Sequence, residues 1–253
     1  MSDVFAYCSV SISPVRHDSS DTSEMVTQLL FGEIVTVLEQ TEKWWRIQSY
    51  ADNYVGWIDP KQVKRLSKKE VNRWLDGLHY QRSQIRKLSS SSGVLSTVKG
   101  SFVPFHVESS FMIGEEEYAF IDEQELLRAT NAFSIAEEYL NAPYLWGGKS
   151  PFGIDCSALV QAAFRFLDVN LPRDASQQVD YGATIEFGDH DCGDVAFFQN
   201  EQDRIIHVGI LNEKNEIIHA SGTVRIDNFD ATGIIHAEKG YKTHTLNCIK
   251  RMI

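Results

Sequence analysis

Residues 144–160 constrain the chain more than any other stretch. A glycine-rich loop with one proline and one lysine ends at Asp155 and Cys156, and residues 158–164 follow with helical periodicity. This order predicts that Cys156 lies in the first turn of a helix. Backbone N–H groups without partners and the positive end of the helix dipole lie there, so the position favours a nucleophilic thiolate. A cysteine taken alone, however, is more often a small core residue.

Composition and charge narrow the class of protein. The 253 residues suffice for one large domain or about two to three small ones. Hydrophobic residues make up 43%, as in a packed globular chain, and the net charge of -11 argues against a general nucleic-acid binder. The start of the chain lacks a signal-peptide pattern and no apolar run is long enough to span a bilayer, so we expect a cytoplasmic protein without a membrane partner. Four scattered cysteines fit a reducing compartment.

The order of predicted elements divides the chain into four segments. Residues 1–66 contain short β-branched and aromatic runs separated by Gly, Asn and Asp, which predicts a small all-β barrel. Residues 67–88 are charged and predict a helical linker. Residues 89–121 return to strand character and predict a second, degenerate barrel. Residues 122–253 mix helical and strand patterns, which indicates an α+β domain.

A helix is predicted at the start of the last segment. Asp122 and Glu125 form a capping box, and apolar residues recur at helical spacing from Leu126 to Leu140. Pro143 prevents the helix from continuing. We interpret the apolar stripe of this helix as core.

A catalytic Cys156 needs a base, and the base needs a residue that orients it. His207 and His219 lie in consecutive predicted strands that are joined by a tight turn. If the loop is odd-numbered and centred on Glu213, the two histidines are direct cross-strand neighbours, with Cβ atoms about 5 Å apart. An even-numbered loop would place them on opposite faces of the sheet.

The other histidines, His244 among them, have no comparable setting and are expected at the surface. A metal site made of Cys156, His207 and His219 would lack a fourth ligand and a short chelating spacing. The sequence therefore predicts no metal and no cofactor.

Several motifs follow one another in the order of a known family. They are Tyr-x-Trp-Gly-Gly, Asp-Cys-Ser-x-Leu-Val, Leu-Pro-Arg-x-Ala-x-x-Gln, Gly-Asp-x-x-Phe-Phe, His-Val-Gly-Ile and Ile-Ile-His-Ala, all between residues 144 and 220. Residues 126–253 thus resemble the NlpC/P60 family of papain-like cysteine peptidases, which act on bacterial cell-wall peptides. The resemblance implies helices packed on an antiparallel sheet.

The amino-terminal segments carry shorter motifs. A Leu-x-Gly-Glu sequence, a Trp-Trp pair and a closing Gly-Trp-Ile occur between residues 30 and 58, a combination that resembles bacterial SH3-like domains. A pair of such domains ahead of the peptidase resembles the γ-D-glutamyl-L-diamino acid endopeptidases (dipeptidyl-peptidase VI type), which act on short murein peptides already released from the wall.

The resemblance implies roles for the catalytic residues. Cys156 would be the nucleophile, His207 the general base and acid, and His219 the residue that orients His207. Tyr144 and the backbone N–H of Cys156 would stabilise the oxyanion of the tetrahedral intermediate.

The resemblance also implies a pocket for the free amine of the substrate, formed by Asp155, Ser157, Tyr54 and Glu24. Two carboxylates that face one ammonium select for an unblocked N-terminus. Asp155 can equally be explained as a helix cap, and Glu24 and Tyr54 as ordinary surface residues.

The leading hypothesis is a cysteine endopeptidase that cuts the bond between γ-D-Glu and the diamino acid of free murein peptides and releases L-Ala-D-Glu during peptidoglycan recycling. One alternative keeps the triad but acts as an N-acetylmuramoyl-L-alanine amidase or another wall-acting hydrolase. The other alternative is a peptide-binding scaffold without catalysis. The expected partner is a murein-derived peptide, and the sequence makes no prediction of the oligomeric state.

Overall fold

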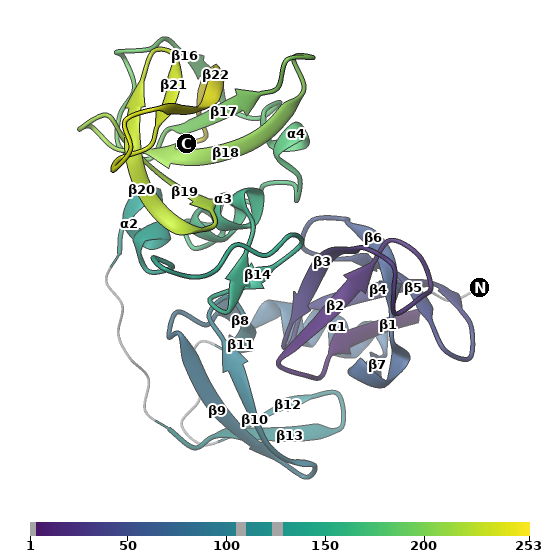
Figure 1. Ribbon diagram of the computed structural model, residues 1–253. Helices are drawn as coiled ribbons and strands as arrows, with labels where there is room; N and C mark the ends of the chain where they lie inside the picture. Colours follow the sequence, from purple (N-terminus) through teal and green to yellow (C-terminus); the bar gives the residue numbers. More distant parts are fainter. Residues whose placement is uncertain (1–3, 105–109, 123–128) are drawn as a thin grey trace. The chain divides into compact units, whose positions relative to one another are not determined.

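The computed structural model describes residues 4–104, 110–122 and 129–253 (Figure 1). The chain forms two compact units, each with its own buried apolar cores. The first unit contains residues 1–127 and 149–151, and the second contains residues 128–148 and 152–253.

The first unit begins with an antiparallel sheet of seven strands in the order β3-β2-β6-β5-β4-β1-β7. The strands are β1 (Val4–Cys8), β2 (Ile12–Arg16), β3 (Met25–Leu30), β4 (Ile34–Gln40), β5 (Trp45–Ser49), β6 (Val55–Ile58) and β7 (Val63–Leu66). A short 3-10 helix, Pro60–Gln62, precedes β7. Val15, Leu29 and Ile47 are among the residues buried inside the sheet. The all-β prediction for this segment is confirmed.

The charged segment that follows is helical only in its first half. Helix α1 (Lys68–Asp76) starts at a capping box in which Ser67 and Glu70 exchange hydrogen bonds, and Gly77 ends it. The helical linker predicted up to residue 88 is wrong beyond Gly77, because two strands begin there. Side chains in the second of these strands alternate between exposed and buried, and this packing outweighs their charged composition.

The strands after Gly77 form one four-stranded sheet, in the order β10-β9-β13-β12, and one two-stranded sheet, β11-β8. The segment predicted as a second barrel, residues 89–121, contains only part of these sheets, because β8 and most of β9 precede it. The strands are β8 (Leu78–Tyr80), β9 (Ile85–Ser90), β10 (Gly93–Val98), β11 (Phe102–Pro104), β12 (Phe111–Ile113) and β13 (Glu116–Phe120). The boundary predicted at residue 89 falls inside β9. The SH3-like character of this segment stays a prediction.

A buried ion pair joins distant parts of the first unit. Lys149 donates to both carboxylate oxygens of Glu33 at 2.8 and 3.0 Å, and the two side chains are 5% and 1% exposed. Glu33 also accepts the N–H of Leu30, so the turn that carries it is fixed. Gly32 in this turn has φ 80°, and a Cβ there would clash with the carbonyl oxygen of Phe102. The Gly-Glu motif therefore has a structural reason.

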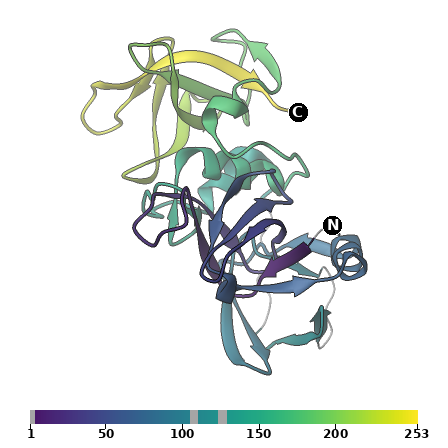
Figure 2. The same cartoon turned by 90° about the vertical axis from the view of Figure 1, so that its right-hand side faces the viewer.

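The second unit is built on a closed antiparallel sheet. Strand β17 pairs with β18 and β22, and β21 pairs with β20 and β22, so β17 to β22 form a ring to which β16 is added. Figure 2 shows β22 in yellow as the long last strand of the chain. The strands are β16 (Ala183–Ile185), β17 (Val195–Gln199), β18 (Ile205–Leu211), β19 (Glu216–Ser221), β20 (Thr223–Asp230), β21 (Gly233–Ile235) and β22 (Lys242–Arg251).

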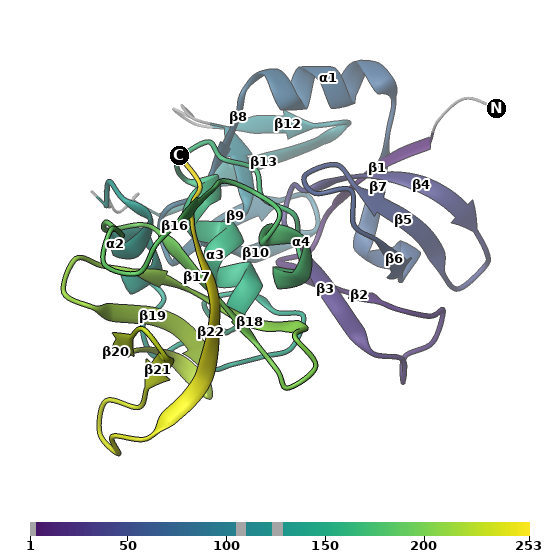
Figure 3. The same ribbon diagram turned by 90° about the horizontal axis from the view of Figure 1, so that it is seen from above.

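Three helices of this unit pack against β18: α2 (Ala132–Glu137), α3 (Cys156–Arg165) and α4 (Ala175–Gln178) (Figure 3). Val208 and Ile210 of β18 belong to the same buried core as the apolar faces of α2 and α3. The short strand β15 (Gly153–Ile154) immediately precedes α3, whereas β14 (Lys149–Ser150) belongs to the first unit. The α+β prediction for this part of the chain is confirmed.

The helix predicted from Asp122 to Leu140 is tested only in part, because residues 123–128 lie outside the described residues. The Asp122 carboxylate accepts the Arg86 Nε–H at 2.7 Å and caps no described helix. Glu125, its expected partner in the capping box, lies outside the described residues. Ala129 is not helical, and α2 begins only after Asn131, which caps it.

We predict that Glu33→Gln destabilises the first unit by about 3–5 kcal/mol, because it leaves the buried ammonium of Lys149 without its neutralising carboxylate. Urea unfolding gives this value. The matched control is Lys64→Met, which breaks the Lys64–Glu116 pair; its side chains are 43% and 16% exposed, and we expect a loss below about 1 kcal/mol. Equal losses in the two variants would contradict the importance of burial.

Candidate active site

Helix α3 places Cys156 at its first residue, as predicted. Asp155 is the N-cap, and its side chain accepts the N–H of Ala158 at 2.8 Å. Cys156 is only 7% exposed, and the backbone N–H of Val208 in β18 hydrogen bonds to its sulfur. The thiol therefore lies against the strand that carries His207.

The carboxylate of Asp155 is fully engaged by protein donors. Arg173, itself 1% exposed, donates from Nη1 to Oδ1 at 2.9 Å and from Nη2 to Oδ2 at 2.6 Å. Oδ1 also accepts the Ser157 hydroxyl, and Oδ2 accepts the Gly147 N–H. The capping interpretation of Asp155 is thus confirmed, and the charge that was expected to bind a substrate amine is neutralised by Arg173.

Arg173 is a site residue that the sequence prediction missed. Its Nη1 also donates to the Ser157 hydroxyl at 2.9 Å, and Gln178 in the same motif donates to the Ser157 carbonyl at 3.0 Å. The Leu-Pro-Arg-x-Ala-x-x-Gln pattern could have pointed to Arg173, because it contains an arginine just before a short helix. Such an arginine is a candidate ion-pair partner for a buried carboxylate.

The expectation that the helix end favours a thiolate is wrong for Cys156 by itself. Burial raises the pKa of its thiol to about 12, and the negative charge of Asp155 acts in the same direction. Hydrogen bonds from the N–H groups of Val208 and Ser157, together with the charge of Arg173, lower the pKa but do not outweigh burial. A thiolate can form here only when a neighbouring group accepts the proton.

His207 and His219 meet, as predicted, on one face of the sheet. The loop between their strands is Glu213-Lys214-Asn215, with Asn215 in the left-handed region at φ 58°. The Nε2 atom of His207 and the Nδ1 atom of His219 lie 2.7 Å apart, and both residues are buried. The odd-numbered loop is thus confirmed.

The predicted register is wrong by two residues, because the centre of the loop lies one residue later than predicted. Ile210 pairs with Ile218, so the loop is centred on Lys214 and His219 lies opposite Gly209 instead of His207. A Cβ on Gly209 would lie 2.9 Å from the Cβ of His219 and 2.8 Å from Ile217. The glycine therefore leaves the space in which the His219 ring reaches diagonally to His207.

Asp227 extends this pair of histidines. Its Oδ2 lies 3.1 Å from Nε2 of His219, and Asp227 is 3% exposed. Its Oδ1 accepts Arg225 Nη2–H at 2.7 Å and the Ala237 N–H at 2.8 Å. Burial raises the pKa of Asp227, but the hydrogen bonds from His219, Ala237 and Arg225 outweigh it and lower the pKa to about 2.

His244 on β22 stacks on His207 and is half-buried, so it has a defined setting that the sequence analysis did not expect. Its ring centroid lies 4.2 Å from that of His207 with an interplanar angle of 21°. Burial lowers the pKa of His244 to about 4, with a further contribution from His219. Burial, then His219 and His244, also lower the pKa of His207 well below its usual value. His207 is therefore held as a neutral base.

The remaining predicted site residues divide between the two units. Tyr144 lies close to Cys156: burial, then the negative charges of Cys156 and Asp155, raise its pKa to about 12, so its hydroxyl stays a donor. Glu24 and Tyr54 belong to the first unit, where Glu24 is exposed and Tyr54 is half-buried. Their roles in substrate binding stay predictions.

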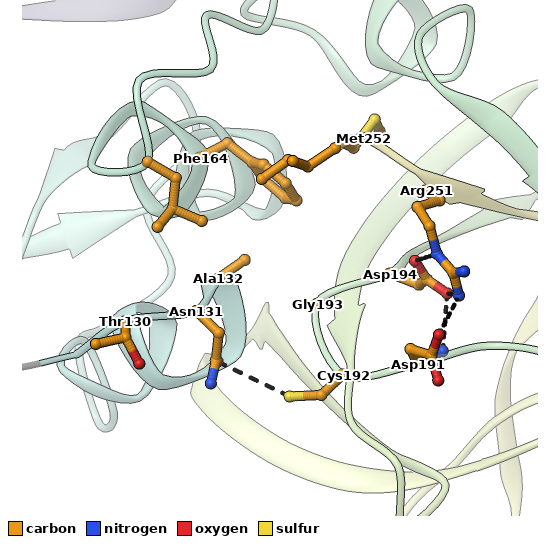
Figure 4. A pocket seen from close by; sticks show the side chains of 12 residues that line it. Thr130, Asn131, Ala132, Phe164, Asp191, Cys192, Gly193, Asp194, Arg251 and Met252 are labelled. Atoms are coloured by element: carbon orange, nitrogen blue, oxygen red, sulfur yellow. Dashed lines mark hydrogen bonds and ion pairs between the residues drawn. The ribbon is translucent and has the colours of Figure 1, made fainter.

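A pocket elsewhere in the second unit contains none of these residues. Figure 4 shows Asp194, Asp191 and Arg251 on one side of it and Asn131 and Cys192 on another. Arg251 pairs with Asp194 at 2.7 Å and with Asp191 at 2.8 Å, and the Cys192 thiol hydrogen bonds to Asn131. The charged groups that line the pocket thus satisfy one another.

Two family models match the chain. Residues 141–243 match the NlpC/P60 family, and residues 15–63 match the bacterial dipeptidyl-peptidase Sh3 domain. The chain therefore contains an NlpC/P60 domain preceded by a bacterial dipeptidyl-peptidase SH3 domain. NlpC/P60 proteins are peptidoglycan-related endopeptidases, generally cysteine peptidases.

Similar proteins agree with this assignment. The γ-D-glutamyl-L-lysine dipeptidyl-peptidase of Bacillus subtilis (strain 168) is 26% identical over 226 residues, which cover 78% of this chain and 72% of that protein. The crystal structure of an NlpC/P60 family protein from Bacillus cereus ATCC 10987 matches with a TM-score of 0.79 at 18% identity, covering 98% of this chain and 99% of that one. An NlpC/P60 endopeptidase from Photobacterium damselae subsp. piscicida matches with a TM-score of 0.71 at 14% identity, covering 97% and 70%. These structures show the same fold.

Among residues 4–104, 110–122 and 129–253, no helix has both the length and the apolar character needed to cross a bilayer. Within the same ranges, no group of three or more His, Cys, Asp and Glu side chains is arranged to hold a metal ion.

We predict that Gly209→Ala lowers enzymatic turnover strongly, because the added methyl displaces His219 from His207. The turnover number and the thermal midpoint are measured together. Gly77→Ala is the control, since Gly77 has φ −115° and a Cβ there meets no atom within 4 Å. Full activity of Gly209→Ala would show that the space opposite His219 does not matter.

The pH dependence of turnover follows from the two shifted pKa values. Because the pKa of His207 is lowered, the base stays unprotonated until the pH falls well below 6.5, and activity is lost only there. Because the pKa of the Cys156 thiol is raised to about 12, its ionisation causes no loss at mildly alkaline pH. The profile of kcat/KM against pH measures both limits, which belong to the coupled pair. An acid limb at or above the ordinary histidine pKa would contradict this.

Proposed function

We propose that this protein is a cysteine endopeptidase that hydrolyses the bond between γ-D-Glu and the diamino acid of free murein peptides and releases L-Ala-D-Glu. The observation that carries the proposal is the 2.7 Å contact between His207 and His219. His207 lies on β18, the same strand whose Val208 N–H hydrogen bonds to the sulfur of Cys156. The NlpC/P60 domain supports the reaction class, and the B. subtilis relative supports the γ-D-glutamyl bond.

The mechanism uses the neutral pair of Cys156 and His207. As the sulfur attacks the γ-carbonyl carbon, His207 takes the thiol proton and becomes an imidazolium. The imidazolium then gives this proton to the nitrogen of the diamino acid, which leaves as an amine while the acyl group remains on sulfur. Water, deprotonated by His207, attacks the thioester, and the proton returns to the sulfur as L-Ala-D-Glu departs.

The negative oxygen of each tetrahedral intermediate needs donors that are already in position. The backbone N–H of Cys156 lies at the start of α3, where the helix leaves its first N–H groups unpaired. Tyr144 supplies the second donor, because its raised pKa keeps the hydroxyl protonated throughout the neutral range. Together they explain why the loop ahead of α3 carries a tyrosine.

We include in the proposal that Asp155, Ser157, Tyr54 and Glu24 contribute to binding the substrate's N-terminal amine. The motifs of the sequence support this part. Because Arg173 already neutralises Asp155, we expect the attraction of the ammonium to depend more on Glu24, and we expect Glu24→Gln to raise KM more than it lowers kcat.

We propose that the place of action is the cytoplasm, in the recycling of wall peptides. All four cysteines of the chain are free thiols, three of them at least partly buried, which supports a reducing compartment.

The first test compares L-Ala-γ-D-Glu-meso-diaminopimelate with its N-acetylated form and with the L-lysine peptide. We expect release of L-Ala-D-Glu from the peptides with a free amine only, and no turnover by Cys156→Ala. Equal cleavage of the acetylated peptide would contradict the amine pocket and favour a wall-acting hydrolase. Turnover that persists in Cys156→Ala would exclude Cys156 as the nucleophile.

A further inference from the structure

The protonation of both catalytic histidines is tied to one buried group. A carboxylate only accepts hydrogen bonds, so His219 must donate from Nε2–H to Oδ2 of Asp227 at 3.1 Å. In a neutral His219 the Nδ1 atom is then an acceptor. The 2.7 Å contact with His207 is therefore a donation from Nε2–H of His207.

The tautomer of His207 determines which of its ring nitrogens can accept the proton of Cys156. A neutral His207 that carries its proton on Nε2 has a lone pair on Nδ1, the ring nitrogen that His219 does not engage. This is the nitrogen that can take the proton of Cys156. If His219 carried its proton on Nδ1 instead, His207 would have to accept at Nε2 and would hold its own proton on Nδ1, where it would block proton transfer from the thiol.

We infer that Asp227 is a positioning residue that sets the tautomers of His219 and, through it, of His207, so that His207 meets Cys156 as a base. The inference rests on the proposed cysteine-peptidase function. Asp227 would then act together with Cys156, His207 and His219. It lies on strand β20, which follows both histidines in the chain.

The surroundings of Asp227 keep it ionised and oriented. Its Oδ1 accepts from Arg225 at 2.7 Å and from the Ala237 N–H at 2.8 Å, and both of these partners are permanent donors here. Oδ2 is thus the oxygen left for His219. His244 packs 6.0 Å from His219, ring centroid to ring centroid, and adds no acceptor at Nε2 of His219 among the described hydrogen bonds.

This arrangement makes an isosteric change more harmful than a truncation. In Asp227→Asn the amide oxygen faces Arg225 and Ala237, because both donate, so the NH2 group faces Nε2 of His219. His219 must then accept at Nε2 and carry its proton on Nδ1, which reverses both tautomers. Asp227→Ala imposes no tautomer. If Asp227 had only a structural role, Asp227→Ala would lose more activity than Asp227→Asn, because asparagine preserves the volume and alanine leaves a cavity.

The chain offers a matched control in Asp194 (Figure 4). This aspartate is also 3% exposed, accepts two hydrogen bonds from Arg251 and one from the N–H of Asp191, and touches no catalytic residue in the described contacts. Asp194→Asn therefore reproduces the loss of a buried, arginine-paired charge without any effect on a histidine tautomer.

The experiment measures the turnover of the free tripeptide and the histidine nitrogen shifts by long-range ¹H–¹⁵N NMR. We expect Asp227→Asn to lower kcat by roughly 10³- to 10⁴-fold, as a wrong tautomer does in a serine-protease triad, and Asp227→Ala and Asp194→Asn to lower it far less. The spectra should show His219 protonated on Nε2 in the wild type and on Nδ1 in Asp227→Asn.

Three results would overturn the inference: Asp227→Asn at least as active as Asp227→Ala, a wild-type His219 protonated on Nδ1, or an unchanged tautomer in Asp227→Asn. If Asp227→Asn does not fold, the wild-type spectrum alone decides. The NMR reading needs no substrate, so an enzyme that cleaves none of the murein peptides would refute the proposed function while the tautomers still test the role of Asp227.

Discussion

The saturated carboxylate of Asp155 holds the candidate site together. It receives five hydrogen bonds, from the loop residue Gly147, from Ser157 and Ala158 at the start of α3, and twice from Arg173. A carboxylate has about four lone-pair positions, so little capacity is left over. Burying this charge is favourable only because every donor is present, and the start of the nucleophile's helix depends on all of them at once.

Burial also decides how the site can be reactive. The same packing that excludes water from Cys156 and His207 makes either charge unfavourable by itself. A thiolate and an imidazolium that appear together still attract each other strongly in a medium of low dielectric constant. The site therefore favours the transfer of one proton within the pair over the gain or loss of a proton from solvent.

Local patterns in the sequence predicted the elements that depend on local chemistry. The helix start at Cys156 and the shared face of His207 and His219 follow from periodicity, and the structure contains both. The two-residue error in register arose because parity fixes the face of a strand but not which residue stands opposite. The helix predicted up to Leu140 is interrupted at Ala129, and α2 begins only after its own cap, Asn131.

Other members of the site were beyond prediction for a related reason. His244 lies on β22, the strand that closes the sheet against β17, and no sequence spacing links it to His207. Asp227 lies on β20, which pairs locally with β19, but the contact with His219 depends on a register that the sequence does not fix. Arg173 was visible in a motif, but its partner was visible only in the folded chain.

The chain enters the first unit twice. Residues 149–151 belong to it although the residues on either side belong to the second unit, and Lys149 places its charge on Glu33 there. The two units are consequently discontinuous in sequence, and no single cut of the polypeptide separates them. A gene fragment that encodes only the peptidase segment would carry a lysine whose counter-ion is encoded elsewhere. Recombination between relatives should therefore exchange Glu33 and Lys149 together, although 115 residues separate them.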